Sequence, residues 1–415
     1  MTDVRREGAW GVIEASAGDD GCLRAAAGSA LYPHVWTRDV GMSAFGILAC
    51  ARSERDVELV LRSLEAIAKH QTALGRMPLK VDVKADVPVL ENSAGVDSSL
   101  WFAVAVDAAA RSHDSSRVRA LVPAAVRGVE WAMHLDANGD SLLETPEASD
   151  WADMMPHRHA VLFTNVLYAE ALDAASRLLA ASASEGDRAR PFAEEAVRVR
   201  SAVRTVFSVR DLTNAAAVGD HLNNVSAANP EFGLTAQYAT RYGDLPFLLP
   251  YVAFRAVGTH CDIVGNLLAV LTGVLDGDAA HRLLDYLAQV GAASPAPTKT
   301  IYPPIQPGHP DWRDHFLWRN LNVPHHYQNG GSWPFAGAMH VAALVRVGRM
   351  SEAKELLSSL EHHLARGPKP FPEWQHGVTG ASMGEPDQLW SAAGWLFASQ
   401  CVRSERVPLW GGATP

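Results

Sequence analysis

Residues 57–68 read VELVLRSLEAIA, and residues 353–364 read AKELLSSLEHHL. In both stretches apolar residues recur at the i, i+3, i+4 and i+7 spacing, as at Val57, Val60, Leu61 and Leu64. This spacing places them on one face of an α-helix, the face by which a helix packs on a core. Stripes of the same kind cover residues 40–52, 98–112, 118–135, 160–182, 192–207, 247–258, 262–275, 279–290, 333–347 and 387–402. Strand signals are sparse, so the pattern predicts an all-α fold of about a dozen helices.

The arrangement of these helices is indicated by the segments between them. No linker, low-complexity tract or fixed-period repeat divides the chain, so we expect one catalytic domain over residues 1–415, with an N-terminal cap segment at 1–30 and a C-terminal tail at 403–415. One core of this size could be an α-solenoid or a closed ring of six helical hairpins. Residues 73–96 and 291–332 form long loops rich in Pro, Gly, Asn, His and aromatics, and such loops are commonly functional. They favour a single (α/α)6 barrel, a six-hairpin toroid, with active-site loops at one mouth.

The composition of the chain disfavours some classes of binding partner. A net charge of −10 and a pI near 5.9 disfavour nucleic acid and anionic membranes, which acidic surfaces repel. The first residues show no apolar stretch behind their arginines, and no apolar run is long enough to span a bilayer, so we expect a cytoplasmic protein. The cysteines show no metal-site or disulfide spacing, and no Gly-rich phosphate loop or Gly-x-Ser-x-Gly elbow is present.

The residues that could carry chemistry gather where loops meet helices. The stretches are 36–39 (WTRD), 96–101 (VDSSLW), 149–153 (SDWAD), 329–334 (NGGSWP) and 371–374 (FPEW). Carboxylates, amides and guanidinium groups beside tryptophans suit sugars, because a pyranose offers apolar C–H faces for stacking and hydroxyls for hydrogen bonds. Cleaving a glycosidic bond needs one protonated carboxyl and one ionised carboxylate. Asp97 and Glu373 are the candidates for these roles, with Glu91 and Glu385 in reserve.

These stretches, together with residues 388–394 (QLWSAAG), resemble the alkaline/neutral invertases and the amylo-α-1,6-glucosidase domains of glycogen-debranching-like proteins. The resemblance runs from about residue 31 to residue 398 and implies an (α/α)6 barrel with its active site at one mouth. It implies Asp97 as general acid and Glu373 as base. Together with the tryptophans beside the acids, the expected substrate-binding residues are Trp36, Arg38, Asp39, Trp101, Asp150, Trp151, Asn329, Trp333, Trp374 and Gln388. The chain departs from these relatives at Gln328, where they carry His, and it is shorter, without an N-terminal β-sandwich.

Structural roles compete with several of these assignments. Asp97 could serve only as a helix N-cap, Arg38 and Asp39 as an internal ion pair, and the tryptophans as core residues. Residues 136–147 superficially resemble a calcium loop, but Ser141 stands where that loop needs Gly, so we expect a tight turn. The histidine pairs 157/159 and 325/326 lack a third ligand at a recognised spacing. We therefore expect no metal and no cofactor.

The resulting hypothesis is an exo-acting, inverting glycoside hydrolase acting on a short α-glucoside or a sucrose-like disaccharide. Inversion needs carboxyl groups about 6.5–9.5 Å apart, and retention needs about 5–5.5 Å. One alternative is a sugar epimerase or isomerase on the same barrel, with His325, His326 or His376 transferring protons. Another is a sugar-binding barrel without catalysis. The expected partner is a small carbohydrate, and assembly into a homo-oligomer stays open.

Overall fold

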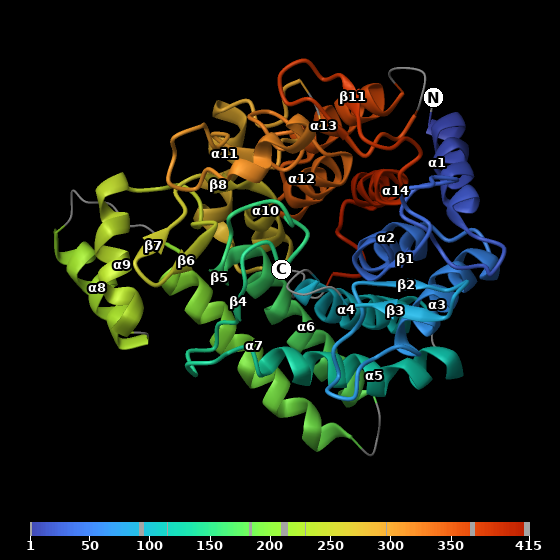
Figure 1. Cartoon of the computed structure of the whole chain (residues 1–415), viewed down its shortest axis with the longest axis horizontal. Helices are drawn as coiled ribbons and strands as arrows, with labels where there is room; N and C mark the ends of the chain where they lie inside the picture. The colour runs from blue at the N-terminus through green and yellow to red at the C-terminus, as the bar shows by residue number, and fades with distance from the viewer. Residues whose placement is uncertain are drawn as a thin grey trace.

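A computed structural model describes residues 2–90, 95–113, 115–181, 185–208, 215–228, 230–295, 297–365 and 370–410. Its helices form two concentric rings (Figure 1). The inner ring consists of α2 (Thr37–Cys50), α4 (Val96–Ser112), α6 (Leu162–Ala180), α10 (Ile263–Leu271), α12 (Pro334–Arg346) and α14 (Leu389–Ser404). Each inner helix packs on the next, and α14 packs on α2, which closes the ring. The predicted all-α class is confirmed.

The outer ring covers the inner one. It consists of α1 (Thr2–Ser16), α3 (Glu54–Ala68), α5 (Ser116–Met133), α7 (Gly186–Val206), α11 (Gly277–Gln289) and α13 (Met350–Leu364). Each outer helix packs on an inner neighbour, α1 on α14. The sequence explains this layering, because inner helices such as α10 and α12 are buried nearly all round, whereas α3 and α11 bury one stripe.

Two expectations about the elements were wrong. Residues 247–258 are not a helix: they contain strands β6 (Tyr251–Ala253) and β7 (Ala256–Val257). A short apolar run bounded by prolines, here Pro246 and Pro250, fits a buried strand as well as a helix, and periodicity alone cannot separate them. The twelfth ring helix is α1, which lies in the segment predicted as a cap. Two further helices, α8 (Ala215–Ala228) and α9 (Pro230–Ala239), lie outside the rings (Figure 1).

Short antiparallel strands lie in the loops that lead into the inner helices. They form the sheets β1 (Val35–Trp36), β2 (Lys80–Asp82), β3 (Val87–Val89); β4 (Glu144–Thr145), β5 (His159–Val161), β6, β7; β8 (Cys261–Asp262), β9 (Ile301–Tyr302); and β10 (Trp374–Gln375), β11 (Ser382–Met383). Strands β1, β5 and β8 run directly into α2, α6 and α10. Because ring helices alternate between outer and inner, the inner helices all run the same way, and their N-terminal ends share one mouth.

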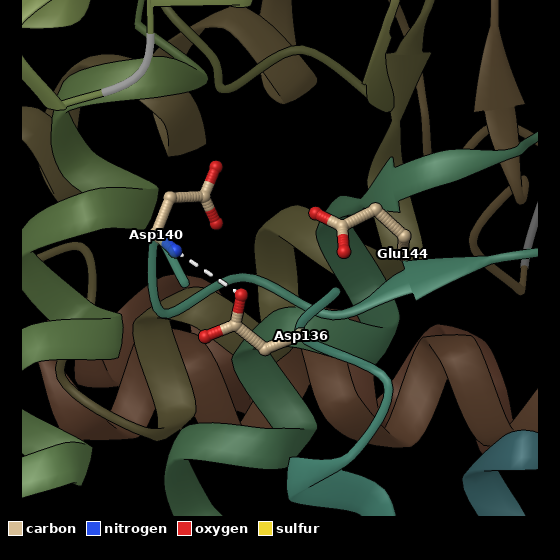
Figure 2. Close-up of side chains that lie close together, drawn as sticks. All are labelled: Asp136, Asp140 and Glu144. Atoms are coloured by element: carbon tan, nitrogen blue, oxygen red, sulfur yellow. Dashed lines mark hydrogen bonds between the residues drawn. The ribbon is translucent and has the colours of Figure 1, made fainter. Parts of the chain in front are cut away.

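The turn between α5 and β4 is the one predicted from residues 136–140. Asp136 accepts hydrogen bonds from the backbone amides of Gly139, Asp140 and Ser141 at 2.8–3.1 Å, so the tight turn is confirmed. The carboxylates of Asp136, Asp140 and Glu144 approach one another, with oxygens within 4.8 Å (Figure 2). The Asp136 oxygens are thus already engaged by the chain's own amides.

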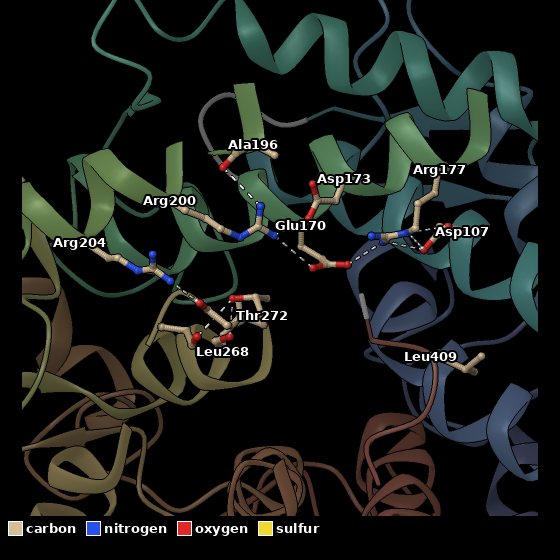
Figure 3. Close-up of polar contacts among 12 residues, drawn as sticks. Asp107, Glu170, Asp173, Arg177, Ala196, Arg200, Arg204, Leu268, Thr272 and Leu409 are labelled. Carbon is tan, nitrogen blue, oxygen red and sulfur yellow. Dashed lines mark hydrogen bonds and ion pairs between the residues drawn. The ribbon is translucent and has the colours of Figure 1, made fainter. Parts of the chain in front are cut away.

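Charged side chains tie the C-terminal halves of neighbouring helices together (Figure 3). Arg177 of α6 donates to Asp107 of α4 at 2.8 Å and to Glu170 at 2.8 Å, and Glu170 is buried. Burial raises the pKa of Glu170 to about 7, because desolvation outweighs its arginine partners.

The segment after α14 fills the base of the helix ring. The indole of Trp410 is buried there and stacks on the phenyl group of Phe45, with 4.6 Å between the centroids.

The ring closes through an unusually close helix contact. A Cβ added to Gly46 of α2 would lie 1.9 Å from the carbonyl oxygen of Ala393 in α14. Only glycine allows the two backbones to approach this closely.

Among the described residues no helix combines the length and hydropathy that crossing a bilayer requires.

Candidate active site

Four acids from four different segments gather at the mouth of the ring, and three of them, Asp39, Asp97 and Asp153, act electrostatically on Arg38. Arg38 and Asp39 lie in the first turn of α2, Asp97 lies in the first turn of α4, and Asp153 and Glu373 lie in the loops before α6 and α14. We call Asp39, Asp97, Asp153 and Glu373 the carboxylate cluster. Each acts electrostatically on at least one other member or on Arg38. The N-terminal ends of inner helices favour negative charge at this mouth.

Asp97 is the buried partner of Arg38. The Arg38 Nε donates to Asp97 Oδ2 at 2.7 Å, and a second guanidinium nitrogen lies 3.4 Å from Oδ1. Asp97 is 0% exposed and Arg38 is 4% exposed. Desolvation raises the pKa of Asp97, although the guanidinium and the Trp151 amide oppose the rise. This carboxylate is enclosed, and both of its oxygens face the guanidinium.

Asp153 is the exposed member of the cluster. Its Oδ1 accepts from the Gln328 side-chain amide at 3.0 Å. The protein around it still desolvates the group, which raises its pKa, with Arg38 opposing and the Asp97 charge adding to the rise. An acid that touches solvent and holds its proton more tightly than usual has the properties of a general acid.

Glu373 is held by two donors. The Tyr32 hydroxyl donates to Oε1 at 2.8 Å, and the backbone amide of Glu385 donates to Oε2 at 3.1 Å. Burial raises the pKa of Glu373, these two donors lower it, and the charges of Glu385 and Asp153 raise it. Gly384 lets the chain fold over this carboxylate, because its φ is +67° and an added Cβ would lie 2.5 Å from Oε2.

Two tyrosines lie near both Asp153 and Glu373. The pKa of Tyr327 is raised well above its usual value by burial and then by the charges of Asp153 and Glu373. The pKa of Tyr32 is raised by burial and by Glu373, Asp39 and Asp153. Because charges act strongly only at short range, these shifts mean that both carboxylates lie near the two tyrosine hydroxyls.

Asp39 completes the cluster. Burial raises its pKa to about 7; Arg38 opposes the rise, and the charges of Glu373 and Asp97 add to it. The predicted ion pairing of Arg38 is therefore made mainly with Asp97 across two helices, and not with its neighbour in sequence.

Three of the predicted substrate-binding residues occupy the N-cap positions of inner helices: Trp36 before α2, Trp333 before α12 and Gln388 before α14. Trp36 is half-buried beneath the Lys80 ammonium, which lies 4.3 Å from the ring centroid. The Trp333 indole donates to the Tyr327 carbonyl oxygen at 2.8 Å. These residues lie at the mouth, and their contact with a substrate stays a prediction.

The other predicted residues are largely committed to the protein. Asp150 accepts from the Ala152 amide and the Thr164 hydroxyl, and Asn329 exchanges hydrogen bonds with the Ile305 backbone. Trp101 is 1% exposed and its ring lies 6.3 Å from that of Trp410, in the core toward the base. The buried rings of Trp151 and Trp374 pack on Phe335 and Tyr327, respectively. The reserve candidate Glu91 lies outside the described residues.

Sequence reasoning missed three residues of this site: Tyr32, Asp153 and Gln328. Gln328 donates to the Trp151 carbonyl oxygen and to Asp153, and accepts from the Met154 amide. An imidazole has two ring nitrogens and could not make all three contacts, so the departure from His at this position has a structural role. Asp153 stood in the quoted stretch 149–153, and the available signal was its place as a second carboxylate close to Trp151.

The histidines of the isomerase alternative form a separate group. The His326 ring lies 4.8 Å from that of His376 and 5.7 Å from that of Trp374. His376 Nδ1 accepts from two backbone amides, those of Val378 and Thr379. Burial lowers the pKa of His325 and of His326, and neighbouring His376 lowers both further. These rings pack beside Trp374 and make no hydrogen bond with the carboxylate cluster among the described contacts.

Part of the chain is similar to a known family. Residues 257–405 match the family of alkaline and neutral invertases. Cytosolic invertase 1 of Oryza sativa subsp. japonica is 28% identical over 144 residues, which is 34% of this chain and 25% of that protein. Alkaline/neutral invertase E, chloroplastic, of Arabidopsis thaliana is 27% identical over 140 residues, 32% of this chain and 22% of that protein. The match therefore spans about a quarter of these relatives' length, and the predicted resemblance to invertases is confirmed.

Solved structures confirm the fold over nearly the whole chain. A GH63 mannosylglycerate hydrolase from Thermus thermophilus, in complex with Tris and D-glycerate, matches with a TM-score of 0.69 at 15% identity, covering 95% of this chain and 100% of that one. A bacterial glucoamylase complexed with acarbose matches with a TM-score of 0.67 at 12% identity, covering 98% and 56%. At this identity the likeness concerns the fold.

Proposed function

We propose that the chain is a glycoside hydrolase whose reacting carboxylates are Asp153 and Glu373. The observation that carries the proposal is their placement: they come from different halves of the chain, and both act on Tyr32 and Tyr327. The invertase resemblance and the hydrolase and glucoamylase neighbours support the same reaction class. Two carboxyl groups across a common space are what glycosidic cleavage needs.

Burial raises the pKa of both carboxylates, so their surroundings separate their roles in this proposal. Asp153 is exposed and receives one side-chain hydrogen bond, so we assign it to give a proton to the glycosidic oxygen as that bond breaks. Glu373 accepts from Tyr32 and the Glu385 amide, which favours its ionised form and orients it to take a proton from the attacking water. The water's oxygen forms the new bond to the anomeric carbon, and its proton passes to Glu373.

Asp97, implied as general acid by the family resemblance, has a different role in this proposal. Its carboxylate is buried, and both of its oxygens face the Arg38 guanidinium. We assign Asp97 to fixing Arg38, which in turn opposes the rise in the pKa of Asp153. Experiment can distinguish whether Asp97 or Asp153 is the general acid.

The preferred substrate in this proposal is a short α-glucoside or a sucrose-like disaccharide, cleaved from its end with inversion. The similar proteins include invertases, a mannosylglycerate hydrolase and a glucoamylase, so sucrose, mannosylglycerate, glucosylglycerate, maltose and isomaltose form the test panel. A cytoplasmic location and the oligomeric state stay predictions.

The test measures release of the free sugar from this panel by wild-type protein and by the Asp153→Asn, Glu373→Gln and Glu385→Gln variants. Loss of general-acid or base catalysis costs about 10²–10⁴-fold in kcat, so the first two variants should fall by that much and the third by far less. On a glycosyl fluoride, whose leaving group needs no proton, Asp153→Asn should retain most of its activity and Glu373→Gln should not. Full activity of both variants on the disaccharide would refute the proposal.

Two further readouts fix the reaction type. Proton NMR of the first-formed product distinguishes inversion from retention by its anomer. Incubating free sugars in deuterated water tests the isomerase alternative, because only that reaction exchanges a carbon-bound proton. Exchange without hydrolysis would replace the hydrolase proposal.

A further inference from the structure

A short 3-10 segment, η2 (Asp314–Asn320), connects the two loops that carry the proposed reacting carboxylates. On one side the His315 Nε2 hydrogen-bonds to the Met154 carbonyl oxygen at 3.0 Å, one residue after Asp153. On the other side the His326 ring hydrogen-bonds to the Asn320 backbone and packs on Trp374, one residue after Glu373. The segment therefore lies along the rim between Asp153 and Glu373.

The middle of η2 is a strained turn. Trp318 has φ −61° and ψ 113°, and Arg319 has φ 51° and ψ 22°, which are close to the angles of a type II turn over residues 317–320. The third position of that turn favours Gly, and a side chain there is strained. Asn320 is also left-handed, with φ 53°. Such strain persists only where the surroundings hold it, and it is commonest at functional positions.

This turn presents a large aromatic ring to solvent. Trp318 is 58% exposed, while Phe316 two residues earlier is 0% exposed and anchors the segment. The Arg319 guanidinium lies over the Trp318 ring at 4.9 Å from its centroid. Arg319 is exposed and makes no hydrogen bond or ion pair with the described residues, so its donors are available to a ligand.

We propose that Trp318 and Arg319 form an outer subsite that binds the leaving group of the substrate, and that this leaving group is a second sugar ring. This inference rests on the proposed hydrolase and names its substrate class. We place the remainder of the substrate along η2, because this segment contacts Met154 next to Asp153 and, through His326, Trp374 next to Glu373. The free face of the indole stacks on the C–H face of a pyranose or furanose, and Arg319 donates to its hydroxyls.

The test compares Trp318→Ala with a matched control on two kinds of substrate. The control is Phe254→Ala, because Phe254 is 52% exposed and its ring also lies beneath an arginine, Arg255, which has φ 63°. The substrates are a hydrolysed disaccharide from sucrose, maltose and isomaltose, and the α-glucosyl fluoride, whose leaving group cannot reach Trp318. Trp318→Ala should raise KM for the disaccharide by about five- to tenfold and leave kcat/KM on the fluoride unchanged. Phe254→Ala should change neither.

Other results overturn the inference. An equal loss on both substrates would mean that Trp318 supports the fold or the reacting groups, and an unchanged KM would mean that it touches no substrate. Hydrolysis of mannosylglycerate or glucosylglycerate with no disaccharide cleaved would exclude a second ring. If no glycoside is hydrolysed, the proposed function fails first, and calorimetric titration of wild-type protein with the three disaccharides tests the subsite separately: binding that Trp318→Ala weakens supports it, and no binding refutes it.

Discussion

Replacing Asp97 by Asn should destabilise the protein far more than replacing Asp153 by Asn. The substitution leaves the Arg38 cation, 4% exposed, without its ionised partner at 2.7 Å. Breaking a buried ion pair costs about 3–5 kcal/mol. Because Asp39 and Asp153 also stabilise the Arg38 charge, we expect a value near the lower end, about 3 kcal/mol. For a chain of 415 residues this lowers Tm by about 3–4 °C.

The assay is urea unfolding followed by circular dichroism, with turnover measured on the same samples. Asp153→Asn should stay within about 0.5 kcal/mol of wild type, since its side chain is exposed, yet lose turnover of the disaccharide. The double variant Arg38→Met with Asp97→Leu should regain most of the stability, because it leaves no unpaired buried charge. If Asp97→Asn instead kept full stability, lost disaccharide turnover and spared the glycosyl fluoride, Asp97 would be the general acid and our assignment of Asp153 would be wrong.

Three further perturbations test other parts of the structure. Gly384→Ala places a Cβ 2.5 Å from Glu373 Oε2, so kcat should fall at least about 100-fold while the folded state persists by circular dichroism. Burial raises the pKa of Asp262 to about 7, so the folded protein holds this proton more tightly than the unfolded chain does, and wild-type stability declines between about pH 4 and pH 7. The Asp262→Asn variant keeps the N-cap of α10 but cannot ionise. Its Tm should therefore exceed that of wild type at pH 8 and not at pH 4. Trp410→Ala removes a buried ring stacked on Phe45 and should cost about 3–5 kcal/mol in urea unfolding, with kcat unchanged at 25 °C; an unchanged midpoint would show that the base does not need this ring.

Most of the ring helices were predictable because their apolar stripes run long enough to separate a helix from a strand. The failures have local causes. Residues 247–258 are apolar but interrupted by Pro250, and α1 was missed although Ala9, Trp10 and Ile13 share a buried face. In the folded chain α1 packs on α14 and also reaches α2, where Arg6 donates to the Cys50 carbonyl oxygen.

The site was predictable only in part, because the sequence shows motifs and not distances. The pattern found the segments around Arg38, Asp97 and Glu373, and all three lie together. It could not show that Arg38 forms an ion pair with Asp97, because a contact between two helices leaves no signal in the local spacing of residues. Tyr32 stood in a loop without any motif, and only the folded chain brings its hydroxyl to Glu373.

Because α14 packs on α2 to close the inner ring, we expect helices to form before catalytic activity appears during refolding. Individual hairpins can become helical early, because their contacts are local. In our proposal turnover needs Asp153 before α6 and Glu373 before α14, the last inner helix in the chain, so activity reports on the assembly of the ring and not on secondary structure alone. In a refolding experiment, recovered activity should therefore lag behind recovered helicity, and the delay would measure how long the inner ring stays open.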